Sequence, residues 1–218
     1  MLTKLRGMFV FCIYNILTKE VFIARDFFGI KPLYYLLNND KKITAFSSEI
    51  KSFLVIPNFK KEVNHDAVFN YLSFQYNPLN ESFFSGVYKL PPGYFVKINT
   101  ETGEYHLEKY WSFKFKKDQN LDENKTKTKI FETIKDSVEH HMIADVPVGA
   151  FLSGGVDSSI ITTLMQKIRG DSKIKTFTVG FDDLTEGVEA KETSSFLNTE
   201  HTEIVVGNKE YFSVLSKA

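Results

Sequence analysis

The sequence predicts two parts of different fold class, an α+β part followed by an α/β part. In the first half, short apolar segments alternate with turns rich in glycine and asparagine, which favours antiparallel strands. In the second half, a strand–helix–strand–helix–strand succession predicts a parallel sheet with right-handed crossovers. Between them, residues 116–129 contain a single apolar residue, Leu121, and cannot form a core. We therefore expect domains at 1–115 and 129–218, joined by a solvated linker at 116–128.

Composition and charge exclude several classes of protein. With 43% hydrophobic and 25% charged residues, the 218-residue chain has an ordinary globular composition. Its 27 basic and 27 acidic residues cancel, so bulk charge points neither to nucleic acid nor to a membrane surface. The basic start and the apolar run at 8–17 imitate a secretory signal, but no small-residue cleavage site follows. Cys12 is alone, which excludes an internal disulfide. We expect a cytoplasmic protein.

The elements of the first half follow from alternation and turn residues. A helix is expected to begin near residue 64, with Asn64 or Asp66 as its cap. Arg25 and Asp26 stand in an aromatic stretch, where buried charge is costly without a partner, so we expect them to pair or to bind backbone groups. The predicted strands are 9–14, 21–24, 33–37, 43–47, 94–98 and 105–111.

In the second half, the spacing of apolar residues alternates between the period of two that is typical of strands and the period of about 3.6 that is typical of helices. His140 and His141 fall near the end of the first helix; without further visible ligands we interpret them as surface residues, and we predict no metal site there. An apolar run at 146–152 predicts a buried strand. The other predicted elements are helices at 127–144, from 156 onward and at 187–197, and strands at 174–181 and 202–206.

The string SGGVDSS at 153–159 lies between the apolar strand and the following helix. Two glycines allow a tight turn with exposed N–H groups, and a helix N-terminus adds unpaired donors and a partial positive charge. No lysine follows, so this is not a Walker-type loop. Asp157 could face phosphates only through a metal ion. A tight turn that binds nothing remains the alternative interpretation of the glycines.

The complete string resembles the pyrophosphate loop of the ATP pyrophosphatase families, which activate a carboxylate or carbonyl by adenylation. A second resemblance lies upstream, in RGMFVF, ARDFFGIKPLYY and FSSEIK, which begin at residues 6, 24 and 46. These strings are similar to the later half of the glutaminase domain of glutamine-hydrolysing asparagine synthetases. That family places this domain before an SGG(L/V)DSS synthetase domain, the order found here. LPPGY at 90–94 and Tyr110-Trp111 also match its interdomain region.

The resemblance implies part of an N-terminal-nucleophile glutaminase β-sandwich, followed by the first strands of an ATP pyrophosphatase domain. It implies ATP-dependent amidation of aspartate to asparagine through a β-aspartyl-adenylate, with Mg²⁺ and with glutamine as nitrogen donor, and it allows a homodimer. By spacing alone, Val179 fits the core as well as it fits a nucleotide contact. The nucleotide-binding residues implied are Leu152, Ser153, Gly154, Gly155, Asp157, Ser158 and Val179, the first and last bordering the nucleotide.

The chain also departs from the family pattern. The family's glutaminase nucleophile is an N-terminal cysteine, whereas residue 2 is Leu2 and Cys12 falls inside a predicted strand, where we expect a small core residue. The residues that bind the acceptor are also missing. We therefore expect an internal fragment, inactive alone, and assign no catalytic residue. A β-lactam synthetase-like or other carboxylate-amidating homologue, or a non-catalytic fragment with unpaired sheet edges, remain the alternatives.

Overall fold

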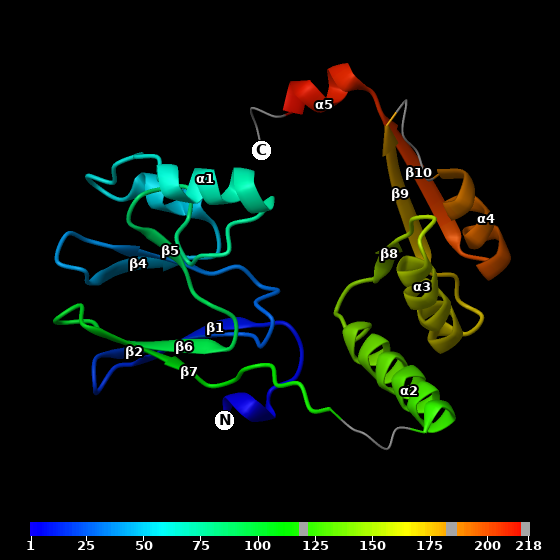
Figure 1. Ribbon diagram of the computed structural model, residues 1–218, viewed down its shortest axis with the longest axis horizontal. Helices are drawn as coiled ribbons and strands as arrows, with labels where there is room; N and C mark the ends of the chain where they lie inside the picture. The colour runs from blue at the N-terminus through cyan, green and yellow to red at the C-terminus, as the bar shows by residue number, and fades with distance from the viewer. Residues whose placement is uncertain (118–121, 182–186, 215–218) are drawn as a thin grey trace. The chain divides into compact units, whose positions relative to one another are not determined.

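The computed structural model describes residues 1–117, 122–181 and 187–214. The chain divides into two compact units, Met1–Lys116 and Lys117–Ala218 (Figure 1). Antiparallel sheets in the first unit and a parallel sheet in the second confirm the mixed α/β character that the sequence predicts. Among the described residues, no helix is both long enough and apolar enough to cross a membrane.

The first unit consists of two antiparallel sheets, ordered β1-β2-β6-β7 and β4-β3-β5. Helix α1 (His65–Phe74) begins where the sequence predicts, because the Asn64 side chain caps it by accepting the Ala67 N–H at 3.2 Å. Two short 3₁₀ helices, η1 (Leu2–Lys4) and η2 (Ile50–Val55), complete the unit. The strands are β1 Val10–Asn15, β2 Glu20–Arg25, β3 Tyr34–Leu37, β4 Ile43–Ser47, β5 Val87–Lys89, β6 Tyr94–Asn99 and β7 Tyr105–Lys109.

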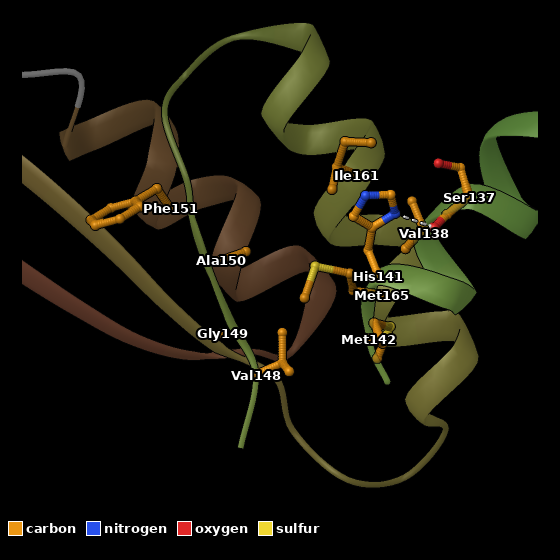
Figure 2. A pocket seen from close by; sticks show the side chains of 10 residues that line it. All are labelled: Ser137, Val138, His141, Met142, Val148, Gly149, Ala150, Phe151, Ile161 and Met165. Carbon is orange, nitrogen blue, oxygen red and sulfur yellow. Dashed lines mark hydrogen bonds between the residues drawn. The ribbon is translucent and has the colours of Figure 1, made fainter. Parts of the chain in front are cut away.

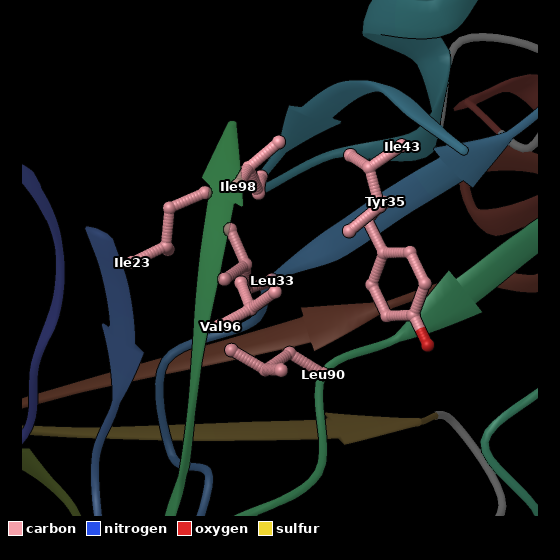
Figure 3. Close-up of a cluster of buried hydrophobic side chains, with 7 residues drawn as sticks. All are labelled: Ile23, Leu33, Tyr35, Ile43, Leu90, Val96 and Ile98. Carbon is pink, nitrogen blue, oxygen red and sulfur yellow. The ribbon is translucent and has the colours of Figure 1, made fainter. Parts of the chain in front are cut away.

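A common core joins the two sheets (Figure 3). Ile23 and Val96 come from the four-stranded sheet, and Tyr35 and Ile43 from the three-stranded sheet. Their side chains are at most 8% exposed, so alternate residues of each strand face this core. Leu33, Leu90 and Ile98 complete the cluster.

The corner after β2 confirms that Arg25 and Asp26 bind backbone groups. The Arg25 guanidinium donates to the carbonyls of Lys31 at 2.7 Å and Gly29 at 2.6 Å, and to that of Leu90. The Asp26 carboxylate accepts three backbone N–H groups from residues 28, 30 and 31, at 3.0–3.2 Å. Gly29 has a φ of +65°, and a Cβ there would lie 2.9 Å from the Arg25 guanidinium carbon, so this corner requires glycine.

Cys12 is exposed, which makes the prediction of a core cysteine wrong. The residue lies on β1, which pairs with β2 alone and forms one edge of its sheet. Alternation directs its side chain to the same face as Ile23, its partner across the ladder, but at this edge the face is uncovered. An apolar pattern predicts the strand and not whether a neighbour covers it.

In the described part of the second unit, β8 (Gly149–Phe151), β9 (Lys175–Phe181) and β10 (Glu200–Val206) form a parallel sheet in the order β10-β9-β8. Helices α2 and α3 pack against each other in a cluster that includes Val138 and Leu164. The helices are α2 Glu123–His141, α3 Val156–Arg169, α4 Gly187–Leu197 and α5 Asn208–Val214.

Several element boundaries in this unit differ from the prediction; α2, for example, ends at His141 and not at 144, and β10 begins at Glu200 and not at 202. Helix α2 begins at Glu123 and not at the predicted residue 127, so residues 123–126, which the sequence assigns to the linker, are helical; residues 118–121 of that linker lie outside the described residues. Asp122 caps the helix by accepting the Lys125 N–H at 2.9 Å, and a helix with exposed first turns needs no apolar residues there. Strand β8 covers only three residues of the run at 146–152 and is not buried, since Phe151 on this edge strand is 78% exposed.

Candidate functional site

The sheet topology brings the predicted loop and the end of β9 to the same edge. Because β8, β9 and β10 are parallel, their carboxyl ends coincide, and ligands of such sheets bind beyond these ends. The register pairs Phe151 with Phe177; continued by two residues, it brings Ser153 level with Val179. Val179 pairs in turn with Ile204 of β10. The loop at 153–155 then leads directly into α3.

Hydroxyl groups hold the loop closed on itself. The side-chain oxygens (Oγ) of Ser153 and Ser158 lie 2.8 Å apart. The Ser158 hydroxyl also lies 3.2 Å from the Ser153 carbonyl oxygen and 3.1 Å from the Gly155 carbonyl oxygen. Backbone donors turn toward the same hydroxyls: Ser153 N–H to Ser158 Oγ and Gly155 N–H to Ser153 Oγ, both at 3.2 Å. Anion binding at these amides would therefore require the serine hydroxyls to rotate or to join the ligand's coordination.

The start of α3 lacks a side-chain cap. Gly155 is the N-cap residue and makes no capping hydrogen bond through a side chain. Asp157 lies in the first turn and is exposed. A helix N-terminus with this arrangement can present backbone N–H groups and a partial positive charge to an anion.

At Gly155 a side chain is disfavoured by lack of space and not by a left-handed backbone. Gly154 and Gly155 do not have positive φ angles; Gly155 is extended, with φ −79° and ψ 154°. A Cβ at Gly155 would lie 3.2 Å from the Ser153 hydroxyl, a tight contact. The expected tight glycine turn is thus replaced by a close approach between backbone and serine.

The two residues expected to border the nucleotide have opposite environments. Leu152 is only 2% exposed; its N–H donates to the Phe177 carbonyl at 2.8 Å, and its own carbonyl accepts the Thr178 hydroxyl. Val179 is 49% exposed, so the alternative of a core residue does not hold in this structure. Leu152 therefore anchors the loop beneath the site, whereas Val179 offers an open apolar surface beside it.

The donor chemistry of the loop fits Mg²⁺ held mainly by phosphate oxygens. Among the described residues, no group of three or more His, Cys, Asp or Glu side chains is arranged to hold a metal. Mg²⁺ usually uses one or two carboxylates together with substrate phosphates and water, and the exposed Asp157 carboxylate can supply one. His140 and His141 instead lie with their Nδ1 atoms 2.7 Å from the backbone carbonyls four residues earlier.

A pocket of about 450 Å³ lies between α2, α3 and β8 (Figure 2). Its walls are mostly apolar, with Met142, Val148 and Met165 among them, and the His141 ring also lines it. None of the seven predicted nucleotide-binding residues lines this pocket. Sequence reasoning does not find it, because it borders the open edge of β8 and the periodicity gives no sign of an edge.

Comparisons with known proteins match both units. Residues 1–111 match the family model described as "Glutamine amidotransferase domain", and residues 129–218 match "Asparagine synthase". The chain is 40% identical over 217 residues to asparagine synthetase [glutamine-hydrolyzing] 1 of Bacillus subtilis (strain 168), covering 99% of this chain and 33% of the relative. It is 30% identical over 222 residues to putative asparagine synthetase [glutamine-hydrolyzing] 2 of Methanocaldococcus jannaschii, covering 98% of this chain and 42% of that relative.

A third relative is amidase chry2 of Gibberella zeae, 32% identical over 222 residues, which cover 91% of this chain and 31% of the relative. The chain thus spans about a third of the length of these curated relatives, as the coverage of 33% for the Bacillus subtilis protein illustrates. Both family models match in the order that the sequence motifs predict. The chain belongs to the glutamine-hydrolysing asparagine synthetase family.

Proposed function

We propose that this chain takes part in the ATP-dependent amidation of aspartate to asparagine, with glutamine as nitrogen donor and a β-aspartyl-adenylate as intermediate. The observation that carries the proposal is the loop at 153–155, which follows a parallel strand, leads into a helix without a side-chain cap and lies within the asparagine synthase match. Relatives named asparagine synthetase [glutamine-hydrolyzing] support aspartate as the acceptor. The reaction would occur in the cytoplasm, with small molecules as substrates.

The finer fold assignment is part of the same proposal. Residues 1–115 would be a portion of an N-terminal-nucleophile glutaminase domain, in which two antiparallel sheets share a core as they do here. Residues 129–218 would be the first portion of an ATP pyrophosphatase domain, for which a parallel sheet and a loop at its carboxyl edge are the support.

Each loop residue has a physical role in this proposal. Backbone N–H groups of Ser153, Gly154 and Gly155 and the α3 N-terminus would stabilise the negative charge of the departing pyrophosphate. The Ser153 and Ser158 hydroxyls, now 2.8 Å apart, would turn toward phosphate oxygens. Mg²⁺ bound to the phosphates would neutralise part of their charge, and Asp157 would then hold the cation instead of repelling the nucleotide.

Calorimetric titration of the purified chain with Mg-ATP tests this assignment. We expect Ser153→Ala and Asp157→Ala to weaken binding at least about tenfold, because each removes a hydrogen bond or ion contact to a charged ligand. Asp171→Ala is the matched control, since this exposed carboxylate follows the opposite end of α3. The Asp171→Ala variant should bind Mg-ATP with the affinity of the wild type. Unchanged affinity in both loop variants would contradict the site, and absence of binding by the wild-type chain would contradict the proposal for this chain.

A further inference from the structure

Leu152, the residue before the loop, forms hydrogen bonds to β9 through both its backbone N–H and its backbone carbonyl. Leu152 N–H donates to the Phe177 carbonyl at 2.8 Å, and the Leu152 carbonyl accepts the hydroxyl of Thr178. Thr178 is 4% exposed and Leu152 is 2% exposed, so both hydrogen bonds are sheltered from water. Buried hydrogen bonds of this kind are costly to break, because the carbonyl left behind has no replacement partner.

The second of these bonds comes from a side chain at the point where the strand ladder stops. Strand β8 ends at Phe151, and its last ladder pair is Phe151 with Phe177. The Thr178 hydroxyl, on the covered face of β9, then reaches the Leu152 carbonyl beyond that pair. A side-chain donor can hold the strand end while the backbone of the two segments separates, which lets the loop at 153–155 leave the sheet.

The loop links Leu152 to helix α3 through contacts between serine hydroxyl groups. Ser153, directly after Leu152, meets Ser158 of α3 through hydroxyl groups 2.8 Å apart. The Ser158 hydroxyl also lies within hydrogen-bond distance of the Ser153 backbone on both its N–H and its carbonyl side. Displacement of Leu152 would therefore move the donors that the proposed pyrophosphate site uses.

We propose that Thr178 is a positioning residue for the nucleotide loop, acting through the Leu152 carbonyl and not by contact with the ligand. This inference rests on the proposed function of the loop. The proposed role of Thr178 requires a hydroxyl group and not merely a β-branched side chain. Serine at position 178 should therefore preserve this role, whereas valine should not.

The same strand offers a matched control. Thr176, two residues earlier on the same face, is fully buried, and its hydroxyl lies 2.9 Å from Thr199 Oγ1 and 3.0 Å from His201 Nδ1. Thr199 in turn lies 2.8 Å from the Ser194 hydroxyl of α4. Thr176→Val thus removes a buried hydroxyl from the same strand and face but disturbs the β10 and α4 side, away from the loop.

Mg-ATP titration of three variants measures the effect on the site. We expect Thr178→Val to weaken binding about tenfold, the equivalent of one buried hydrogen bond. Thr178→Ser should bind within about twofold of the wild type, and Thr176→Val should bind like the wild type although it lowers the melting temperature. Equal affinity of Thr178→Val and wild type, or equal weakening by both valine variants, would overturn the inference.

Amide hydrogen exchange of the ligand-free chain separates this inference from the proposed function. Thr178→Val should accelerate exchange at 152–158, whereas Thr176→Val should accelerate it in β10 and leave those residues unchanged. If the wild-type chain fails to bind Mg-ATP, the proposed function fails, but the exchange experiment still decides whether Thr178 orders the loop. Wild-type exchange at 152–158 in Thr178→Val would overturn the positioning role.

Discussion

At the scale of single residues, the corner after β2 shows how two charged side chains can be buried when backbone groups form hydrogen bonds with them. Burial alone raises the pKa of Asp26, but backbone hydrogen bonds, led by that from the Lys31 N–H, outweigh it and hold the pKa below its ordinary value. Desolvation lowers the pKa of Arg25, while the charge of Asp26 acts in the opposite direction. The ionised form of Asp26 therefore stabilises the corner more than the protonated form does.

This argument predicts an acid-dependent stability. Because the folded pKa of Asp26 lies below the unfolded value, its contribution is present above the unfolded pKa, near 4, and is lost as the pH falls through the folded pKa. We expect Asp26→Asn to lower the free energy of unfolding by about 1–3 kcal/mol at neutral pH and by clearly less at about pH 3.

Urea unfolding followed by tryptophan fluorescence measures this difference. Trp111 is the single tryptophan of the chain, and its ring lies 5.1 Å from that of Phe28 in the same corner, so it reports on the region. Asp40→Asn, at an exposed aspartate in the turn between β3 and β4, serves as the control and should change little. An equal loss at both pH values for Asp26→Asn would refute the electrostatic explanation.

At the scale of elements, the two edges of the four-stranded sheet differ in chemistry. The outer strand β7 carries His106, Glu108 and Lys109, and charges on an edge discourage pairing with another chain. The opposite edge, β1, reads VFCIYN and has no charged residue. Asp26 N–H donates to the Phe9 carbonyl, so by antiparallel alternation residues 10, 12 and 14 direct their backbone groups away from β2.

We predict that β1 is the strand through which the chain self-associates. Ile13→Lys should reduce light scattering at a given concentration, because a charge on the edge opposes strand pairing. Ile13 is 49% exposed, so the substitution should cost no more than about 0.5 kcal/mol of stability. His106→Lys on β7 is the control and should leave scattering unchanged; an equal reduction by both variants would point to net charge and not to the β1 edge.

Element type and the Asn64 cap of α1 could be predicted from the sequence, whereas the start of α2 and the edges of the sheets could not. Helix α4 begins and ends at the predicted residues, and β4 matches its predicted range, since hydrophobic period and turn residues determine both. The sequence does not indicate the start of α2, because a polar, exposed first turn has no hydrophobic signal. The sequence also does not indicate that Cys12 is exposed, because periodicity cannot distinguish an edge strand from a central one.

The candidate site was predictable to a similar degree. A contiguous motif locates residues 152–158, and parallel topology adds Val179 at the same sheet edge. The serine-to-serine contact and the role of Thr178 were not predictable, because a threonine in a strand is ordinary and its partner lies 26 residues away in sequence. The glycine conformations were also not predictable, since sequence alone does not distinguish a positive φ from a close approach.

At the scale of the whole molecule, charge balance and exposed apolar residues act together. The formal net charge is zero at pH 7, and the sequence pI is about 7.0. Proteins near zero net charge lack the repulsion that keeps copies apart. Large apolar side chains are exposed as well, among them Leu17 at 93%, Phe151 at 78% and Leu72 at 75%. We therefore expect copies of the chain to attract one another through exposed apolar side chains, to an extent that depends on pH.

Dynamic light scattering across pH tests this combination. We expect association to be strongest near the sequence pI of about 7.0 and to decline toward about pH 5, because the chain has a positive net charge below its pI. Added salt near pH 5 should restore association, since screening removes the repulsion between copies and leaves the hydrophobic attraction intact. Association that stays constant between these pH values, or that salt weakens at pH 7, would show that attraction between opposite charges holds the copies together.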